Sequence, residues 1–318
     1  MHANEVFPTE LWKIIARYAC TDGGVTARAL SLTSRHLNQV VEPDKFVSVS
    51  LIGVKQISNF TAIVGRTTRR VRCVRHLFLG YEPPQDIIRD SSDQQEEERT
   101  ICATITTLLK MVAPTLVTLH TFISLANPIL FSFQSPLPRL EQLAMHKNFL
   151  IKPGDRVKPL FPSLQELYTF EFSYTIRAGR NPLRKVLGRI AKNAPRLAKL
   201  YSPRVLPKFA NIVHLGTCID EMWPDSAIAS SLDVFVLVLK DTPETTHDLI
   251  RELAKTDPRI KYLDAESLLE MRLDEARSHW VCCVEVDSKD GIWEVDGERP
   301  EFRHIKKSDT VVKRALRP

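Results

Sequence analysis

The sequence is poor in cysteine and glycine, and both shortages limit what the protein can be. Eleven glycines in 318 residues leave little material for the glycine-rich loops that cradle nucleotides and phosphates. The six cysteines are scattered, and none has Cys-x-x-Cys spacing. This distribution argues against a disulfide framework or a zinc site, and it favours a reducing cytoplasmic or nuclear location.

Long apolar stretches are also missing. The longest stretch without charge, residues 111–138, is interrupted by His120 and four prolines, so it does not read as a membrane span. The first residues lack the basic and apolar regions of a secretory signal. The composition, 43% hydrophobic and 26% charged, is that of an ordinary globular protein. We therefore expect no membrane partner.

Catalytic patterns are absent from the sequence as well. It has no phosphate-binding loop, no Gly-x-Ser-x-Gly nucleophile turn and no His-Glu-x-x-His zinc motif. The nine histidines are dispersed, and Cys282 and Cys283 lie in an apolar run without an activating neighbour. We expect a protein that is not an enzyme, with no catalytic, cofactor-binding or metal-binding residues.

The net charge of +6 raises the question of nucleic-acid binding. The densest basic patch contains Arg66, Arg69, Arg70, Arg72 and Arg75. No aromatic residues that stack on bases are interleaved with it, and no known nucleic-acid motif accompanies it. We interpret the patch as a solvated edge and expect no nucleic acid, although an acidic protein partner would also fit.

The clearest positive signal is the recurring phrase Pro-x-Leu-x-x-Leu. It begins at Pro114, Pro138 and Pro162, at a spacing of 24 residues, and again at Pro195 and, with Ile in place of the first Leu, at Pro258. The Leu-x-x-Leu spacing without proline occurs at residues 74–77 and 212–215. A period of this length is typical of leucine-rich repeats, in which each unit supplies one short parallel strand and neighbouring units stack.

The segments between these phrases predict alternating helices and strands. We expect strands at 47–51, 233–239, 259–263 and 280–286, and helices around 101–112, 181–194, 242–253 and 266–277. This order predicts an α/β fold, an irregular leucine-rich-repeat solenoid with a parallel sheet and a C-terminal cap, over residues 47–305. Residues 306–318 form a basic tail that we expect to be frayed.

The first 46 residues differ from the rest and predict three short helices. Apolar residues in 7–18 recur at helical spacing, a second helix fits 25–32, and a third fits 34–41 with Ser34 as its cap. A unit of this size buries too little apolar surface to be stable on its own.

Two runs in this segment resemble the F-box family. The first, residues 7–15, is Phe-Pro-Thr-Glu-Leu-Trp-Lys-Ile-Ile, where the family pattern is Leu-Pro-x-Glu-Leu-x-x-x-Ile; the second, residues 29–37, follows an insert at 21–26. Phe7 and Ser34 stand where the family usually has Leu and Cys. The likeness covers residues 5–45.

The resemblance implies that these helices dock on the Skp-type adaptor of a Skp–cullin–F-box ubiquitin ligase. Carried over by position, the contacts would come from Phe7, Pro8, Leu11, Ile14, Ile15, Leu30 and Leu32. The implied function is a substrate-recognition adaptor that holds an unknown protein target on its repeat domain, through the strand face or its rim.

Two alternatives remain open at this point. The apolar stripe could pack on the chain's own repeat domain, because periodicity does not say what a face is packed against. The protein could also be a leucine-rich-repeat scaffold with no connection to a ligase.

Overall fold

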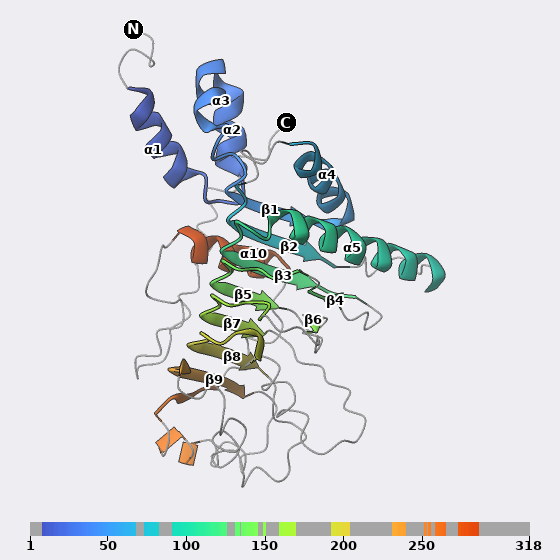
Figure 1. Ribbon diagram of the computed structural model, residues 1–318, viewed down its shortest axis with the longest axis vertical. Coiled ribbons are helices and arrows are strands. Elements are labelled where there is room, and N and C mark those ends of the chain that lie inside the picture. Colours follow the sequence, from blue (N-terminus) through green and yellow to red (C-terminus); the bar gives the residue numbers. More distant parts are fainter. Residues whose placement is uncertain are drawn as a thin grey trace. The chain divides into compact units, whose positions relative to one another are not determined.

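The computed structural model has an α/β fold, with a parallel sheet and helices (Figure 1). It describes residues 8–67, 73–82, 91–125, 131–133, 135–145, 149–150, 159–169, 192–203, 231–239, 251–252, 254–255, 258–264 and 273–285. All of these residues lie in one compact unit that ends at Glu285. The sequence copy at 212–215, most of the helix predicted at 181–194 and the tail at 306–318 lie outside the described residues.

Three helices open the described chain, as the sequence predicts. They are α1 (Thr9–Ala19), α2 (Val25–Thr33) and α3 (Arg35–Val41). Ser34 is the N-cap of α3, and its hydroxyl oxygen accepts a hydrogen bond of 3.1 Å from the Leu37 amide. Pro8 is the residue immediately before α1 rather than its first turn.

Eight described strands form one parallel sheet. In chain order they are β1 (Ser48–Ile52), β2 (His76–Tyr81), β3 (Thr118–Ile123), β5 (Gln142–Met145), β7 (Glu166–Thr169), β8 (Lys199–Pro203), β9 (Val234–Leu239) and β10 (Ile260–Asp264). Their order across the sheet is the same as their order along the chain. A separate parallel pair is formed by β4 (Phe131–Ser132) and β6 (Phe149–Leu150).

The proline phrases explain how the strands begin. In three phrases the amide of the first leucine donates to the carbonyl of the residue just before the proline, over 3.2–3.3 Å: Leu140 to Leu137, Leu164 to Phe161, and Leu197 to Ala194. Proline suits this turn because its φ is already fixed and its missing N–H is not needed there. Each described Pro-x-Leu-x-x-Leu phrase is thus a turn followed by one strand, as predicted.

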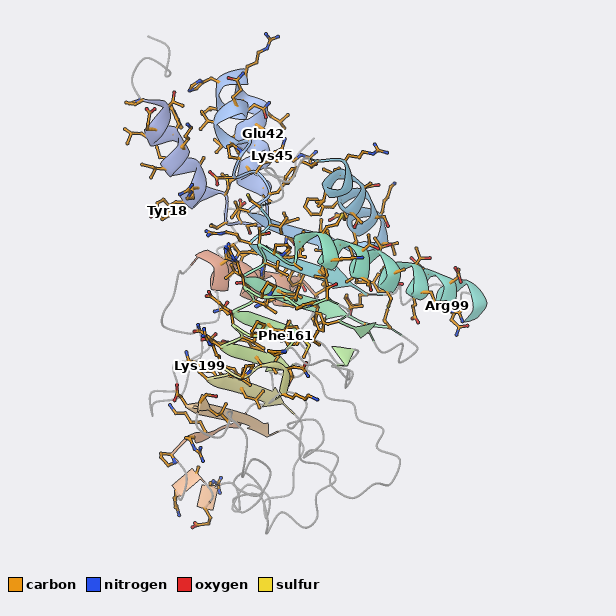
Figure 2. The ribbon with its side chains drawn as sticks, viewed as in Figure 1. Tyr18, Glu42, Lys45, Arg99, Phe161 and Lys199 are labelled. Carbon is orange, nitrogen blue, oxygen red and sulfur yellow. The ribbon has the colours of Figure 1, made fainter. Side chains whose placement is uncertain are left out.

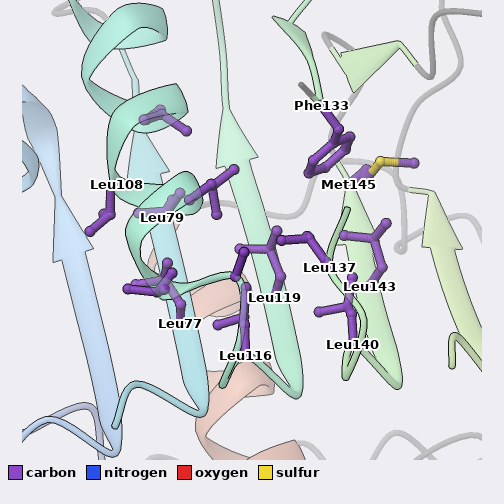
Figure 3. Packing of buried hydrophobic residues seen from close by; sticks show 14 of the residues in the cluster. Leu77, Leu79, Leu108, Leu116, Leu119, Phe133, Leu137, Leu140, Leu143 and Met145 are labelled. Carbon is purple, nitrogen blue, oxygen red and sulfur yellow. The ribbon is translucent and has the colours of Figure 1, made fainter. Parts of the chain in front are cut away.

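The leucines of these phrases form the core. Leu77, Leu119, Leu143, Leu167 and Leu200 occupy equivalent positions in neighbouring strands, and all are almost completely buried. Figure 3 shows the packing of Leu77, Leu119 and Leu143 with leucines of the turns. In these five strands the ladder buries one leucine each, and burial stabilises the fold by about 25 cal/mol per Å² of apolar surface.

Helices α4 (Gly53–Arg66) and α5 (Ser91–Val112) cover one face of the first strands. Ile57, Phe60 and Val64 of α4 and Ile105 and Leu108 of α5 belong to the same core cluster as Leu77. The sequence predicts a helix around 101–112, which is the second half of α5, and it predicts no helix at the position of α4.

The last described helix, α10 (Leu273–Glu285), corrects one expectation. The sequence predicts a helix at 266–277 and a strand at 280–286, but the chain is helical from Leu273 to Glu285. A run of β-branched and aromatic residues suggested a strand. The helix forms because Leu273, Ala276 and Trp280 recur at helical spacing and are packed together with Phe78 and Phe122.

Candidate interaction surfaces

The helical segment has only a small internal core. Four residues fill it, Ala16, Cys20, Ala27 and Val41, with Leu30 packed against them. Of the eleven residues of α1, only Ala16 is buried. This cluster buries little apolar surface, so the three helices hold each other only weakly.

Most of the large apolar side chains of this segment point into solvent. Six side chains from α1 and α2 are between 44% and 79% exposed: Leu11, Ile14, Ile15, Tyr18, Val25 and Leu32. Only one other large apolar residue among those described, Ile63, is exposed to a similar degree. We call these six residues the N-terminal apolar face; Figure 2 labels Tyr18, whose side chain extends away from α1.

The predicted adaptor contacts divide into three groups. Leu11, Ile14, Ile15 and Leu32 lie on the N-terminal apolar face, and Pro8 is exposed beside it. Leu30 is half-buried and packs inward on the small core. Phe7 lies outside the described residues. The predicted contacts do not include Tyr18 and Val25, which are also on this face.

The exposure of this face bears on the alternative that the apolar stripe packs on the chain's own repeat domain. In the part of the chain that the structure describes, Leu11, Ile14 and Ile15 belong to neither the sheet core nor the small helical core, and between 44% and 53% of each residue is accessible. Since several large apolar side chains are exposed together, this face is the candidate interaction surface of the helical segment.

The turn between α1 and α2 fastens the helices to the sheet. Gly23 and Gly24 have φ of 79° and 94°, which favours glycine at both positions. The Gly23 amide donates to the Ser48 hydroxyl over 3.2 Å, and that hydroxyl donates to the Thr21 carbonyl over 2.7 Å. A side chain at Gly23 would place its Cβ 2.9 Å from that of Ser50, so the close approach itself requires glycine.

Asp22 stabilises the same turn from the other side. Its carboxylate accepts from the Thr26 amide at 2.9 and 3.1 Å and from the Thr26 hydroxyl at 2.6 Å. Negative charge at the start of α2 also suits the positive end of the helix dipole. The turn is therefore defined by both backbone geometry and specific hydrogen bonds.

The sheet face opposite α4 and α5 carries a row of polar side chains. Lys199 lies 3.0 Å from one oxygen of Glu166, and the other oxygen accepts from Gln142 at 3.2 Å and from the Tyr168 hydroxyl at 2.8 Å. Tyr168 stacks on Tyr201 with ring centroids 4.3 Å apart and an angle of 5°. Burial, together with the negative charge of Glu166, raises the pKa of Tyr201 to about 12, so its hydroxyl stays protonated at neutral pH.

Two threonines near the ends of strands form hydrogen bonds to neighbouring strands. Thr121 donates to the Ala144 carbonyl at 3.1 Å, and Thr169 donates to the Tyr201 carbonyl at 3.0 Å. Both threonines are buried, and they bond to the next strand. Their hydroxyl groups therefore stabilise the sheet.

The described residues offer few candidates for catalysis or metal binding. No group of three or more His, Cys, Asp or Glu is placed to hold a metal ion in the part of the chain that the structure describes. Burial and nearby Asp22 and Asp44 raise the pKa of Cys20 to about 11, so the thiol is protonated and a poor nucleophile. Within the described ranges, no helix combines the length and apolar character needed to cross a membrane.

Comparison with protein-family models and with curated proteins returned no match for this chain.

Proposed function

We propose that the protein is a substrate-recognition adaptor of a Skp–cullin–F-box ubiquitin ligase. Its N-terminal helices bind a Skp-type adaptor protein, and its leucine-rich-repeat domain binds the protein to be modified. The chain itself supplies no catalytic group. It acts by raising the effective concentration of the target's lysines near the ligase's conjugating enzyme.

The observation that carries the proposal is the N-terminal apolar face. The F-box-like residues Leu11, Ile14 and Ile15 lie on one side of α1, and all three are exposed. In a lone globular protein, such residues are expected in the core. Exposure of several together costs stability unless a partner covers them.

The small core of the helical segment supports the same proposal. Since Ala16, Cys20, Ala27 and Val41 bury little surface, a partner that covers the apolar face would add more burial than the segment has by itself. An amphipathic helix laid in a partner's groove is a common way to achieve this.

The one-strand-per-phrase sheet supports a target-binding role for the remaining chain. Stacked βα units present an extended array of side chains, and proteins built from them are mainly interaction surfaces. In this proposal, the target-binding part is the irregular leucine-rich-repeat solenoid that the sequence predicts over residues 47–305.

Co-purification with a Skp-type adaptor tests the proposal. The full chain should bind the adaptor, and a variant with Leu11→Asp and Ile15→Asp should lose binding while it stays folded. Lys13→Asp with Arg28→Asp is the matched control, because both residues are exposed but lie outside the apolar face. Failure of the folded wild-type chain to bind would refute the ligase role and leave the scaffold without a ligase connection as the better hypothesis.

A further inference from the structure

The N-terminal helices and the sheet have separate cores. Ala16, Cys20, Ala27 and Val41 fill the core of the helices, and none of them belongs to the cluster built around the leucine ladder. A segment with so small a core gains little rigidity from its own packing. Its direction relative to the sheet therefore depends on the contacts where the two parts meet.

The turn between α1 and α2 is one such meeting point, because it reaches the first strand of the sheet. The Gly23 carbonyl accepts a hydrogen bond of 3.3 Å from the Ser50 amide, in addition to the two bonds made by the Ser48 hydroxyl. Ser48 is almost completely buried, so its bonds are shielded from competition by water. Three hydrogen bonds thus tie the turn to β1.

Trp280 reaches the same turn from the other end of the described chain. A Cβ placed on Gly23 would lie 3.2 Å from Cζ3 of the Trp280 ring and 2.9 Å from Cβ of Ser50. The Trp280 ring is completely buried, and its centroid lies 5.7 Å from that of Phe78 on β2. Trp280 therefore lies close to both the turn and the sheet.

Trp280 is itself held in place by the sheet. It shares a buried cluster with Phe122 on β3 and Ala276 on α10, and Figure 1 shows α10 alongside β2 and β3. An aromatic ring has only two side-chain torsions, so packing on several sides leaves it few alternative positions. The ring is thus a fixed surface against which the turn rests.

The glycine pair in the turn is explained by this close packing rather than by a hinge. Gly23 has a φ of 79°, and the Ser50 and Trp280 side chains leave no space for a side chain on it. Asp22 adds further order, since its carboxylate accepts three hydrogen bonds from Thr26. The turn is therefore constrained from several sides.

We propose that Trp280 is a positioning residue that holds the turn at Gly23 and thereby fixes the direction of the N-terminal apolar face relative to the sheet. Ser48 is the second part of the same mount, because its hydroxyl bonds to two residues of the turn. The role of the mount rests on the proposed function: a Skp-type adaptor on this face is held in one direction relative to a target on the sheet. Action through effective concentration depends on such geometry.

Distance measurement by pulsed electron spin resonance tests the mount. Spin-labelled unnatural amino acids replace Lys13 on α1 and Glu141 just before β5, both of which are exposed, so the native cysteines stay unlabelled. The wild-type chain should give one narrow distribution of distances. Trp280→Leu keeps an apolar side chain but removes the ring, and its distribution should be roughly twofold wider, because the turn then samples several orientations.

Leu200→Ala is the matched control. Leu200 is almost completely buried in the leucine ladder, so its replacement lowers stability but should leave the width of the distribution unchanged. An unchanged width in folded Trp280→Leu would overturn the proposal, and so would an equal widening in Leu200→Ala.

Ser48→Ala decides the case in which Trp280→Leu does not fold, because it removes only a hydroxyl group. A wider distribution in this variant would support the mount, and an unchanged one would refute it. No adaptor is present in these measurements. A narrow wild-type distribution in a chain that binds no adaptor would refute only the proposed function, whereas adaptor binding by a chain with a broad distribution would refute only the mount.

Discussion

Replacement of Leu143 by alanine tests the leucine ladder most directly. Leu143 is fully buried on β5, in register with Leu119 on one side and Leu167 on the other. The change removes apolar contacts with both neighbouring strands and leaves a cavity that a packed sheet cannot close. Such substitutions cost about 2–5 kcal/mol, and the central position of Leu143 favours about 3 kcal/mol or more.

Urea unfolding followed by circular dichroism measures this loss. The midpoint should fall with little change in slope, because the folded surface changes little. Glu141→Ala is the matched control: Glu141 lies two residues away, its side chain is exposed, and its replacement should cost less than about 0.5 kcal/mol. Similar losses for the two variants would show that Leu143 does not lie in a buried ladder, and the strand register would have to be abandoned.

Four further substitutions and titrations follow from named contacts. Ser34→Ala removes the cap of α3 and should cost about 1 kcal/mol in urea unfolding, whereas Ser34→Asp should retain stability; equal loss in both would contradict the capping role. Asp22→Ala should lower the urea midpoint, because the Thr26 amide and hydroxyl lose their acceptor; an unchanged midpoint would refute that contact. Gly80→Ala would place a Cβ 2.5 Å from Leu273 Cδ1, so the flexible Leu273 side chain has to shift and hydrogen exchange in residues 273–285 should become modestly faster; unchanged exchange would contradict this close approach. Because the folded chain holds the Cys20 proton up to a pKa of about 11 while an unfolded thiol loses it near 9, stability should fall as pH rises from about 9 to 11, and Cys20→Ala should remove that part of the slope.

The sequence predicts the sheet well because the repeated phrase combines two local signals. Proline and the first leucine mark the turn, and the second leucine marks the buried side of the strand, so each copy identifies its own element. Ser34 was equally predictable, since a cap depends on the next three residues only. The three short helices follow from the same kind of local pattern.

The missed features depend on distant residues. The helical state of Trp280 reflects its packing against Phe78 and Phe122, and neither is near it in sequence. Local propensity alone reads the β-branched neighbours of Trp280 as a strand. Helix α4 begins at a glycine with φ of 80°, which obscured an otherwise regular pattern of Ile57, Phe60 and Val64.

The sequence predicts the N-terminal apolar face only in part, because its exposure depends on how the helices pack. Periodicity placed Leu11, Ile14 and Ile15 on one face of a helix, but only the folded structure shows that this face is exposed. The same reasoning predicts Leu30 on this surface, but Leu30 packs against the small helical core, because the sequence of each helix does not determine the angle between them.

The position of α10 also sets an order of events during synthesis. The strands that carry Phe78 and Phe122 are synthesised well before Trp280, which covers them. At a synthesis rate of roughly 5–20 residues per second, the two phenylalanines stay uncovered for on the order of ten seconds or longer before Trp280 is made. During that time the growing chain presents an aromatic patch to its surroundings, so nascent chains stalled before Trp280 should be those that chaperones retain and that aggregate first.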